Sequence, residues 1–313
     1  MAIGGIFVTT AFLFPGQGAQ KVGMGKGFWK NFPKCKEIFE KASQKCPFNL
    51  LEIIFEGPQE KLNLTAVSQP AILTVSYTAL EAMKEVKNIP FDFAAGLSLG
   101  EYTALLAAEA IEFEPVLELV IHRGQFMQEA CDKVKGGMAS IMGLDRPKIE
   151  EIVSEVAQEA VLSIANYNSP KQIVISGEEK GLAKAEELLK KAGARRVIPL
   201  QVAGAYHSPL MEMAQEKLAP YVEEAPFQKP KVPVISNVTA GPMEEVEEIK
   251  QNLIQQVTSS VRWSDSMEYF VRQGMNQAYE IGPGTVLKGL MRQINREVKV
   301  NSLGSPEDLE QLN

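Results

Sequence analysis

The sequence predicts an α/β fold in which a parallel β-sheet is covered by helices on both faces, and three observations support this prediction. The chain has 313 residues, of which 45% are hydrophobic, so it can bury a large core. Continuous apolar runs alternate with helical patterns, as is typical of parallel sheets buried on both faces. Each run leads through a glycine-rich or polar turn into the next helix; the runs are residues 11–14, 91–97, 232–237 and 277–281.

The turns after these four runs are where functional residues are expected. In parallel sheets ligands bind beyond the carboxyl ends of the strands. The turns begin with the sequences PGQGAQ, SLGEY, VTAG and GPGTVLKGL. We therefore expect these four segments to meet at one edge of the sheet.

The segment between residues 136 and 202 has a different order of elements. We predict a strand at 136–144, a helix at 147–160, strands at 160–165 and 172–176 joined by a turn at 166–170, a helix at 178–192 and a strand at 195–201. This β-α-β-β-α-β order is the ferredoxin-like motif. We interpret residues 131–203 as a small subdomain inserted into a larger α/β catalytic subdomain made of residues 1–130 and 204–313.

Composition excludes several classes of protein. The net charge of −7 and the pI near 5.2 argue against binding to nucleic acid or to a membrane surface. No apolar run approaches the ~20 residues of a membrane span, and residues 1–10 lack the basic segment of a signal peptide. The three cysteines lack metal-ligand spacing and fit free thiols in a reducing, cytoplasmic compartment.

Ser98 is the candidate nucleophile. GLSLGEY, residues 96–102, fits the pattern G-x-S-x-G at a strand-to-helix turn. Such a turn is so sharp that a Cβ atom at Gly96 or Gly100 would collide with neighbouring backbone. The serine hydroxyl then stands at the positive end of the next helix, and the Leu99 amide can donate to an oxyanion. The alternative is a helix-capping serine without chemistry, but the strand before it and the helix after it favour a nucleophile.

A serine nucleophile needs a base, and the chain has two histidines. His122 lies in a helix predicted from Pro115 to Ala130 and shares its face with glutamate and glutamine, which predicts a solvated side chain. His207 follows a strand and a GAY turn and precedes Ser208-Pro209, a credible helix start. A loop at a strand end is a usual place for a catalytic residue, although His207 could also only cap its own helix. We predict His207 as the base.

Arg123 falls inside an apolar stripe of the same helix. One explanation is that its charged end reaches the surface along its neighbours. The other is that the guanidinium binds a substrate carboxylate through two parallel hydrogen bonds, which would suit a dicarboxylic acyl group. The stripe consists of Val116, Leu119, Val120, Arg123, Phe126, Met127 and Ala130.

Seven motifs in fixed order cover residues 14–290: PGQGAQ, SQPA, GLSLGEY, RGQFM, NYNSP, GAYHSPLM and EIGPG. With them the chain resembles the malonyl-CoA:acyl-carrier-protein transacylase family of fatty-acid synthesis. The resemblance implies an α/β-hydrolase-like core with a ferredoxin-like insertion. It also implies transfer of a malonyl group from malonyl-CoA to the phosphopantetheine thiol of acyl-carrier protein, through a ping-pong seryl-ester mechanism.

The resemblance assigns roles to individual residues. Ser98 is the nucleophile and His207 the base, which in this family is oriented by backbone carbonyl groups. The backbone amides of Gln17 and Leu99 form the oxyanion hole, and Arg123 binds malonate.

Three further residues match the family less distinctly. Gln256 corresponds to a glutamine that supports the site, although it could be an exposed helical residue. Asn166 and Asn168 match asparagines near the histidine, and their alternative role is to form the turn before Pro170.

Two positions depart from the family pattern. Leu97 stands where members often have a histidine before the nucleophile, which should alter packing or acyl preference. Tyr206 stands where many members have phenylalanine and adds a hydroxyl group. Ala205-Tyr206 only partly fits the malonyl-selective pattern of related modular synthases.

Three rival functions remain open at this point. They are a serine esterase or thioesterase, a non-catalytic acyl- or carrier-binding protein that keeps the fold, and a transferase of another acyl-CoA such as methylmalonyl- or acetyl-CoA. We expect no metal or redox cofactor, because PGQGAQ lacks the third glycine and the downstream acid of a dinucleotide site. No feature indicates an oligomer, so a monomer is the default expectation.

Overall fold

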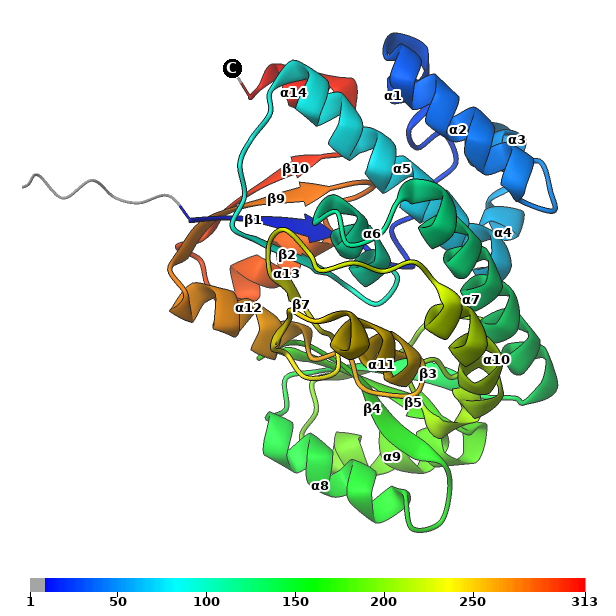
Figure 1. The fold of residues 1–313 in the computed structure, drawn as a ribbon. Helices are drawn as coiled ribbons and strands as arrows, with labels where there is room; N and C mark the ends of the chain where they lie inside the picture. The colour runs from blue at the N-terminus through cyan, green and yellow to red at the C-terminus, as the bar shows by residue number, and fades with distance from the viewer. Residues whose placement is uncertain (1–8, 313) are drawn as a thin grey trace, which may run out of the picture.

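A computed structural model describes residues 9–312, which form two β-sheets surrounded by helices (Figure 1). Residues 1–8, to which most of the signal-peptide argument refers, and residue 313 lie outside the described part. Within it, the larger sheet has six strands in the order β10-β9-β1-β2-β7-β8. Their bounds are β1 Thr9–Phe14, β2 Phe93–Gly96, β7 Val234–Ile235, β8 Pro242–Met243, β9 Met275–Ile281 and β10 Lys299–Leu303.

The large sheet is parallel except at one edge. β1 pairs in parallel with β2 and β9, β2 with β7, and β9 with β10, whereas β8 returns antiparallel to β7. The four predicted strands therefore all end at the same edge, which confirms that the four turns gather there. β8 and β10 were not predicted.

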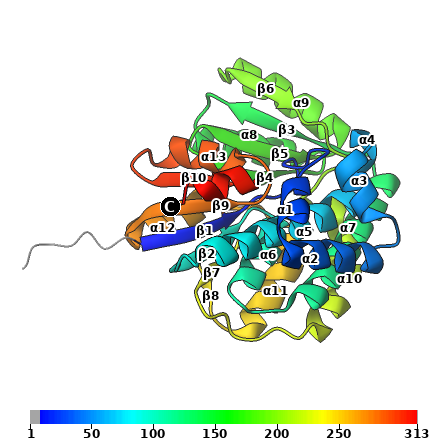
Figure 2. The same cartoon turned by 90° about the horizontal axis from the view of Figure 1, so that it is seen from above.

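Helices cover both faces of this sheet. Successive residues of a strand point to opposite faces, so each strand contributes side chains to two separate cores. Phe12 and Phe14 of β1 enter one core, and Ala11 and Leu13 enter the other. The second core is covered by α12 (Trp263–Arg272) and α13 (Val286–Ile294), on the opposite side of the sheet from α5 and α6 (Figure 2). The first core is covered by α1 Lys26–Asn31, α2 Pro33–Lys45, α3 Leu50–Glu56, α4 Gln59–Leu62, α5 Thr65–Val86, α6 Gly100–Ala107, α7 Phe113–Lys133, α10 Glu212–Glu224, α11 Val246–Gln256 and α14 Pro306–Glu310.

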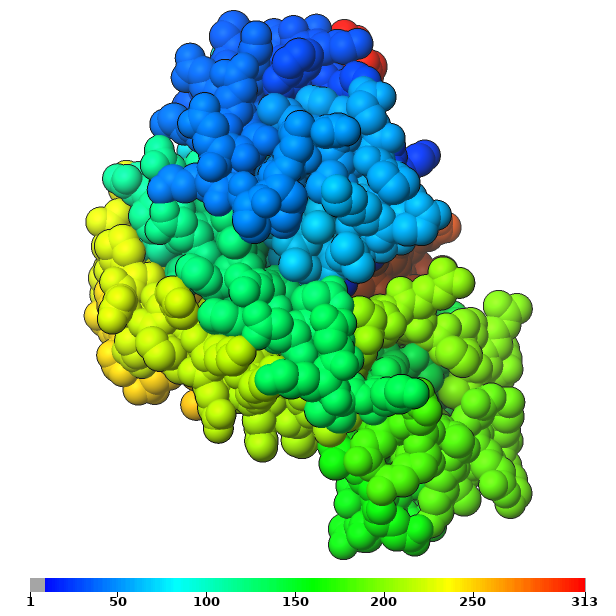
Figure 3. All heavy atoms as spheres, turned by 90° about the vertical axis from the view of Figure 1, so that its right-hand side faces the viewer, coloured from blue at the N-terminus to red at the C-terminus, as the bar shows by residue number. Residues whose placement is uncertain are grey.

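The smaller sheet is antiparallel, with the strand order β4-β5-β3-β6. Figure 3 shows this part of the chain, in green, as a lobe beside the rest of the molecule. Strands and helices follow one another in the predicted order; they are β3 Gly137–Met142, α8 Arg146–Val156, β4 Leu162–Ser169, β5 Gln172–Gly177, α9 Glu179–Lys191 and β6 Arg196–Pro199. The chain thus has an α/β fold with a mainly parallel sheet and a separate antiparallel sheet.

The predicted turn at residues 166–170 is wrong, because β4 continues through Ser169. Tyr167 donates its amide hydrogen to the carbonyl oxygen of Val261, 2.9 Å away, and Asn166 forms a parallel bridge with the same residue. These bonds to Val261, which lies outside the small sheet, extend the strand over Asn166 and Asn168. Separately, none of the helices in residues 9–312 is long and apolar enough to cross a membrane.

Candidate active site

Ser98 occupies the sharp turn between β2 and α6 with a backbone φ of 53°, a left-handed conformation that is costly for serine. A Cβ atom at Gly96 would lie 1.8 Å from the carbonyl carbon of Gly100. A Cβ atom at Gly100 would lie 2.1 Å from the carbonyl oxygen of Phe14. The predicted need for glycine on both sides of Ser98 is therefore confirmed.

Asn237 braces this turn from the neighbouring strand. It follows β7, and its side-chain Oδ1 accepts a hydrogen bond from the amide of Ser98, at 2.6 Å. Its Nδ2 donates to the carbonyl oxygen of Gly96, at 2.8 Å. The sequence analysis expected functional residues after residues 232–237 but did not single out Asn237.

His207 lies in the loop between β6 and the short 3₁₀ helix Pro209–Met211, which begins with Ser208 as its cap, as predicted. Its Nε2 lies 2.8 Å from Ser98 Oγ, and its Nδ1 lies 2.9 Å from the backbone carbonyl oxygen of Gln256. Because a carbonyl only accepts, Nδ1 carries the hydrogen and Nε2 is free to accept the Ser98 proton. Burial, together with the charge of Arg123, lowers the pKa of His207 to about 4, so the imidazole is neutral at pH 7.

Arg123 is buried beside the serine and does not reach the surface. Its Nη1 donates to Gln69 Oε1 at 2.7 Å. Its Nη2 donates to Gln256 Oε1 at 2.9 Å and to Ser98 Oγ at 3.0 Å. A guanidinium held by two neutral amides keeps its full charge available for an anion in the site. Gln69, in the SQPA motif, received no role in the sequence analysis.

Gln256, the last residue of α11, is fully buried, so the alternative of an exposed helical residue is wrong. Besides accepting from Arg123, its side chain donates through Nε2 to the carbonyl oxygen of Ser98 at 3.1 Å. The same Nε2 lies 3.0 Å from Glu101 Oε2. One glutamine therefore contacts the serine, the histidine and the arginine.

Glu101 is a buried carboxylic acid directly behind this cluster. Its Oε2 accepts from the amide of Asn237 at 2.8 Å as well as from Gln256. Burial raises the pKa of Glu101 to about 7, against the opposing effect of these hydrogen bonds and of Arg123. The sequence analysis quoted Glu101 within GLSLGEY without assigning it a function.

The segments that carry the Gln17 and Leu99 amides lie against each other. A Cβ atom at Gly16 would lie only 2.2 Å from the carbonyl oxygen of Leu97. Within residues 9–312, neither the Gln17 nor the Leu99 amide donates a hydrogen bond to the protein. Both are therefore free to donate to a bound oxygen atom.

A cavity of about 500 Å³ opens over Ser98 between the two sheets. Ser98, after β2, and Val286, in α13, line it from the side of the large sheet, and Met138 and Val174 line it from the small sheet. Side-chain amides dominate its polar lining, and they come from Gln17, Gln20, Gln59, Asn63, Asn166, Asn168, Gln172 and Gln201. Such a lining offers donors and acceptors without charge, and Arg123 is the cation that lines it.

Comparison with known proteins decides the family. The acyl transferase domain family matches residues 11–303. The malonyl CoA-acyl carrier protein transacylase of Bacillus subtilis is 44% identical over 301 residues, which are 96% of this chain and 95% of that protein. The chain belongs to the malonyl-CoA:acyl-carrier-protein transacylase family.

Solved structures of transacylases have the same fold. The malonyl CoA-acyl carrier protein transacylase of Coxiella burnetii superposes with a TM-score of 0.94 at 36% identity, covering 98% of this chain and 97% of that one. A malonyl-transacylase in complex with a type II PKS acyl-carrier protein gives 0.93 at 37% identity, covering 97% and 98%. With 97–98% of this chain covered, the superposition includes both sheets.

In this member of the transacylase family, Asn166 and Asn168 line the cavity from β4, so their alternative role as turn residues is wrong. Asn166 is buried, and within the described chain Asn168 Oδ1 is buried without a hydrogen-bond partner. An unpaired acceptor at this depth is available to a ligand.

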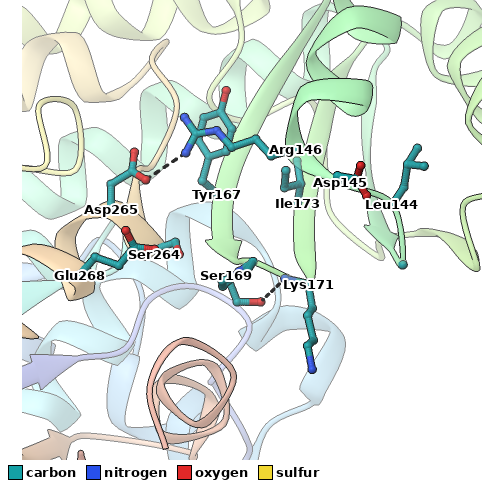
Figure 4. Close-up of a pocket in the computed structure, with 12 residues that line it drawn as sticks. Leu144, Asp145, Arg146, Tyr167, Ser169, Lys171, Ile173, Ser264, Asp265 and Glu268 are labelled. Carbon is teal, nitrogen blue, oxygen red and sulfur yellow. Dashed lines mark hydrogen bonds and ion pairs between the residues drawn. The ribbon is translucent and has the colours of Figure 1, made fainter.

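A second cavity, of about 420 Å³, lies where the small sheet meets α12 (Figure 4). Arg146 lies with its guanidinium carbon 3.9 Å from the ring centroid of Tyr167 and donates to Asp265 Oδ1 at 2.9 Å. Tyr167 faces this cavity whereas its neighbours Asn166 and Asn168 face the first one, as strand alternation requires. The lining of the second cavity contains no histidine, no cysteine and no serine at a strand-to-helix turn like that of Ser98. We therefore assign the acyl-transfer chemistry to the cavity over Ser98.

His122 is partly exposed, so its side chain is less solvated than predicted. Its ring stacks on Tyr221 of α10, with ring centroids 4.0 Å apart, and burial lowers its pKa. Glu118 and Gln125, which share the face of α7 with His122, are exposed as predicted, and the His122 ring packs against α10.

The three cysteines are free, as predicted, and all are buried. Burial raises the pKa of Cys35 and of Cys46 to about 12 and that of Cys131 to about 11, so none is a reactive thiolate at neutral pH. Within residues 9–312, no three histidine, cysteine or acidic side chains gather as metal ligands.

Proposed function

We propose that this protein is a malonyl-CoA:acyl-carrier-protein S-malonyltransferase of fatty-acid biosynthesis. The observation that carries the proposal is the buried Arg123, which donates to the same Ser98 hydroxyl that His207 contacts. A serine–histidine pair alone would suit any acyl group. A buried guanidinium at the nucleophile favours an acyl group that ends in a carboxylate.

In the first half-reaction His207 Nε2 accepts the Ser98 proton while Oγ bonds to the thioester carbonyl carbon of malonyl-CoA. The amides of Gln17 and Leu99 donate to the resulting oxyanion, and each contributes roughly 3 kcal/mol. The carbon–sulfur bond then breaks, and the coenzyme A sulfur takes the proton from His207. A malonyl ester on Ser98 remains.

In the second half-reaction the phosphopantetheine thiol of acyl-carrier protein enters after coenzyme A has left. His207 accepts the thiol proton as the sulfur attacks the ester carbonyl, and it returns this proton to Ser98 Oγ when the ester bond breaks. The products are malonyl-acyl-carrier protein and free enzyme, so every step uses protein groups alone.

The remaining candidate residues bind and orient. Arg123 pairs with the malonyl carboxylate and fixes the acyl chain, which favours transfer over hydrolysis. Gln256 holds both Arg123 and His207 in place. Asn166 and Asn168 donate and accept hydrogen bonds along the cavity wall, where the amide-containing pantetheine arm would pass.

We also infer the finer architecture. Of the predicted catalytic subdomain, residues 1–130 and 204–313, the described residues 9–130 and 204–312 form an α/β-hydrolase-like unit, and residues 131–203 form a ferredoxin-like subdomain. The β-α-β-β-α-β order and the strand order β4-β5-β3-β6 support the second description. Three buried free thiols support a cytoplasmic, reducing location. We also infer that the protein is a monomer, which meets its carrier protein transiently.

The test is the intact mass of the protein after brief incubation with malonyl-CoA, beside acetyl-CoA and a Ser98→Ala variant. We expect a malonyl adduct on the wild type alone, which acyl-carrier protein discharges. Rapid loss of the adduct to water without carrier would favour the esterase or thioesterase. No adduct from either donor would favour the non-catalytic binding protein, and an acetyl adduct in preference would favour another acyl donor.

A further inference from the structure

Glu101 is a buried acid for which the acyl-transfer mechanism above has no use. It is the second residue of α6, immediately behind the Ser98 turn, and its exposed fraction is 0%. Burying a carboxyl group is costly unless its oxygens are paired. Its Oε2 is paired twice, whereas within the described chain its Oε1 has no partner.

Both partners of Oε2 also hold reacting groups. The residue whose amide donates to Glu101, Asn237, accepts the Ser98 amide on its own side chain. The other donor, Gln256, holds Arg123 through Oε1 and His207 through its backbone carbonyl. The Glu101 side chain makes no hydrogen bond to Ser98, His207 or Arg123; the Glu101 backbone amide, which any residue would supply, donates to the Ser98 carbonyl oxygen. Any effect of the carboxyl group therefore passes through Asn237 and Gln256.

The side-chain amide of Gln256 has an oxygen that accepts and an NH₂ group that donates, and the two have nearly the same shape. A carboxyl group at position 101 can select between its two orientations. The Gln256 amide could lie with either end toward Arg123, and only one arrangement places an acceptor there. Glu101 Oε2 accepts from the Asn237 amide, so it presents an acceptor to Gln256 whether the carboxyl group is ionised or carries a proton on Oε1. This acceptor forces the NH₂ group of Gln256 toward Glu101 and its oxygen toward Arg123. The reverse arrangement would turn the NH₂ group of Gln256 against the guanidinium, so that Arg123 Nη2 would keep only its bond to Ser98 Oγ.

We propose that Glu101 is a positioning residue for malonyl transfer, which sets the Gln256 amide and the Asn237 loop and thereby aligns Arg123 and Ser98. The inference rests on the proposed function, because Arg123 matters only for an acyl group with a free carboxylate. The proposal adds to that function a role for Glu101, which orients the Gln256 amide so that its oxygen accepts from Arg123.

Glu101→Gln is the decisive variant, because it keeps shape and one acceptor but allows both arrangements of the Gln256 amide. The matched control is Glu81→Gln, which removes another buried acid. Glu81 lies on α5, about 18 Å along the helix from Gln69. It pairs with Lys84 of the same helix and with Lys34 of α2. Loading of Ser98 is measured by quenched-flow intact mass with malonyl-CoA and with acetyl-CoA, and the melting temperature is recorded for each protein.

We expect Glu101→Gln to slow malonyl loading about tenfold and acetyl loading less, so that the preference for malonyl falls. Glu81→Gln should lower the melting temperature but leave both loading rates and the preference unchanged. Wild-type loading rates in Glu101→Gln, or an unchanged malonyl preference, would overturn the positioning role while leaving the transferase intact. Absence of malonyl loading in the wild type would instead refute the proposed function on which the inference rests.

Discussion

The Nδ1 atom of His207 lies 2.9 Å from the backbone carbonyl oxygen of Gln256, in the position where many serine hydrolases place a carboxylate. A carbonyl fixes the ring and its tautomer as a carboxylate does, but it adds no negative charge to stabilise the imidazolium. The positive Arg123 is close as well, so the protonated ring is disfavoured twice. The consequence is a weakly basic histidine that stays neutral well into the acid range.

The pH dependence of loading follows from this environment. Because the folded-state pKa of His207 is about 4, below the ordinary value of 6.5, the base is already in its active neutral form at pH 6. We expect kcat/KM for Ser98 loading to show no histidine inflection between about pH 5.5 and pH 8. Stopped-flow loading across this range checks the prediction. Glu101, with a pKa of about 7, could add an inflection of its own, so the outcome that would contradict the prediction is an inflection near 6.5 that persists in Glu101→Gln.

Substitution of the two histidines should have different consequences for the rate of Ser98 loading. His207→Ala removes the proton acceptor from the serine, so we expect Ser98 loading to fall at least about 1,000-fold. His122→Phe keeps the ring stack with Tyr221, so its loading rate should equal that of the wild type. Intact-mass time courses of both variants measure this difference, and equal losses would place the base elsewhere.

Arg123 and Arg146 allow a second comparison of a site residue with a matched control. Both lie beside an aromatic ring, but only Arg123 donates to Ser98. Arg123→Ala should reduce malonyl loading by about 100-fold and acetyl loading much less, because only malonyl carries the second carboxylate. Arg146→Ala should weaken the contact with Asp265 and lower the melting temperature without changing the malonyl-to-acetyl ratio. Proportional losses for both donors in Arg123→Ala would mean that the arginine is structural.

Gln256→Ala isolates the side chain from the backbone. The carbonyl that orients His207 remains, whereas the bonds to Arg123, Glu101 and the Ser98 carbonyl are lost. We expect kcat/KM for malonyl loading to fall by about 10- to 100-fold with an unchanged pH profile. Gln255→Ala, at the exposed neighbouring position, should behave as the wild type; steady-state kinetics of the two variants provide the comparison.

How much of this site the sequence could predict depends on the range of each interaction. Ser98, His207 and Arg123 each sit in a local signal: a glycine-flanked turn, a loop after a strand, and a charge within an apolar stripe. Glu101 and Asn237 give no such signal, because their roles arise from hydrogen bonds between residues 136 positions apart. His122 is less exposed than predicted for the same reason, since Tyr221, which stacks on its ring, comes from α10.

The strands show the same limit. Apolar runs revealed the four central parallel strands, which are buried on both faces. β10, Lys299–Leu303, is an edge strand whose polar residues interrupt the apolar pattern, and β8 is only a short return strand, so neither stood out. β4 extends past its apolar part because its backbone pairs with Val261, which no local pattern reveals.

Gly100 offers the sharpest test of the turn itself, because the space for its side chain is filled by main chain. A Cβ atom there would lie 2.1 Å from the carbonyl oxygen of Phe14, an atom of the central strand that cannot move without disturbing the sheet. We expect Gly100→Ala to lower the free energy of unfolding by at least about 3 kcal/mol, or to prevent folding. Gly289→Ala is the matched change at an exposed position of α13, with nothing within 4 Å of the new methyl group. It should raise the free energy of unfolding by about 0.5–1 kcal/mol. Urea unfolding of both variants measures the two values; a Gly100→Ala protein as stable as the wild type would mean that the turn can relax, and that glycine is not needed there for steric reasons.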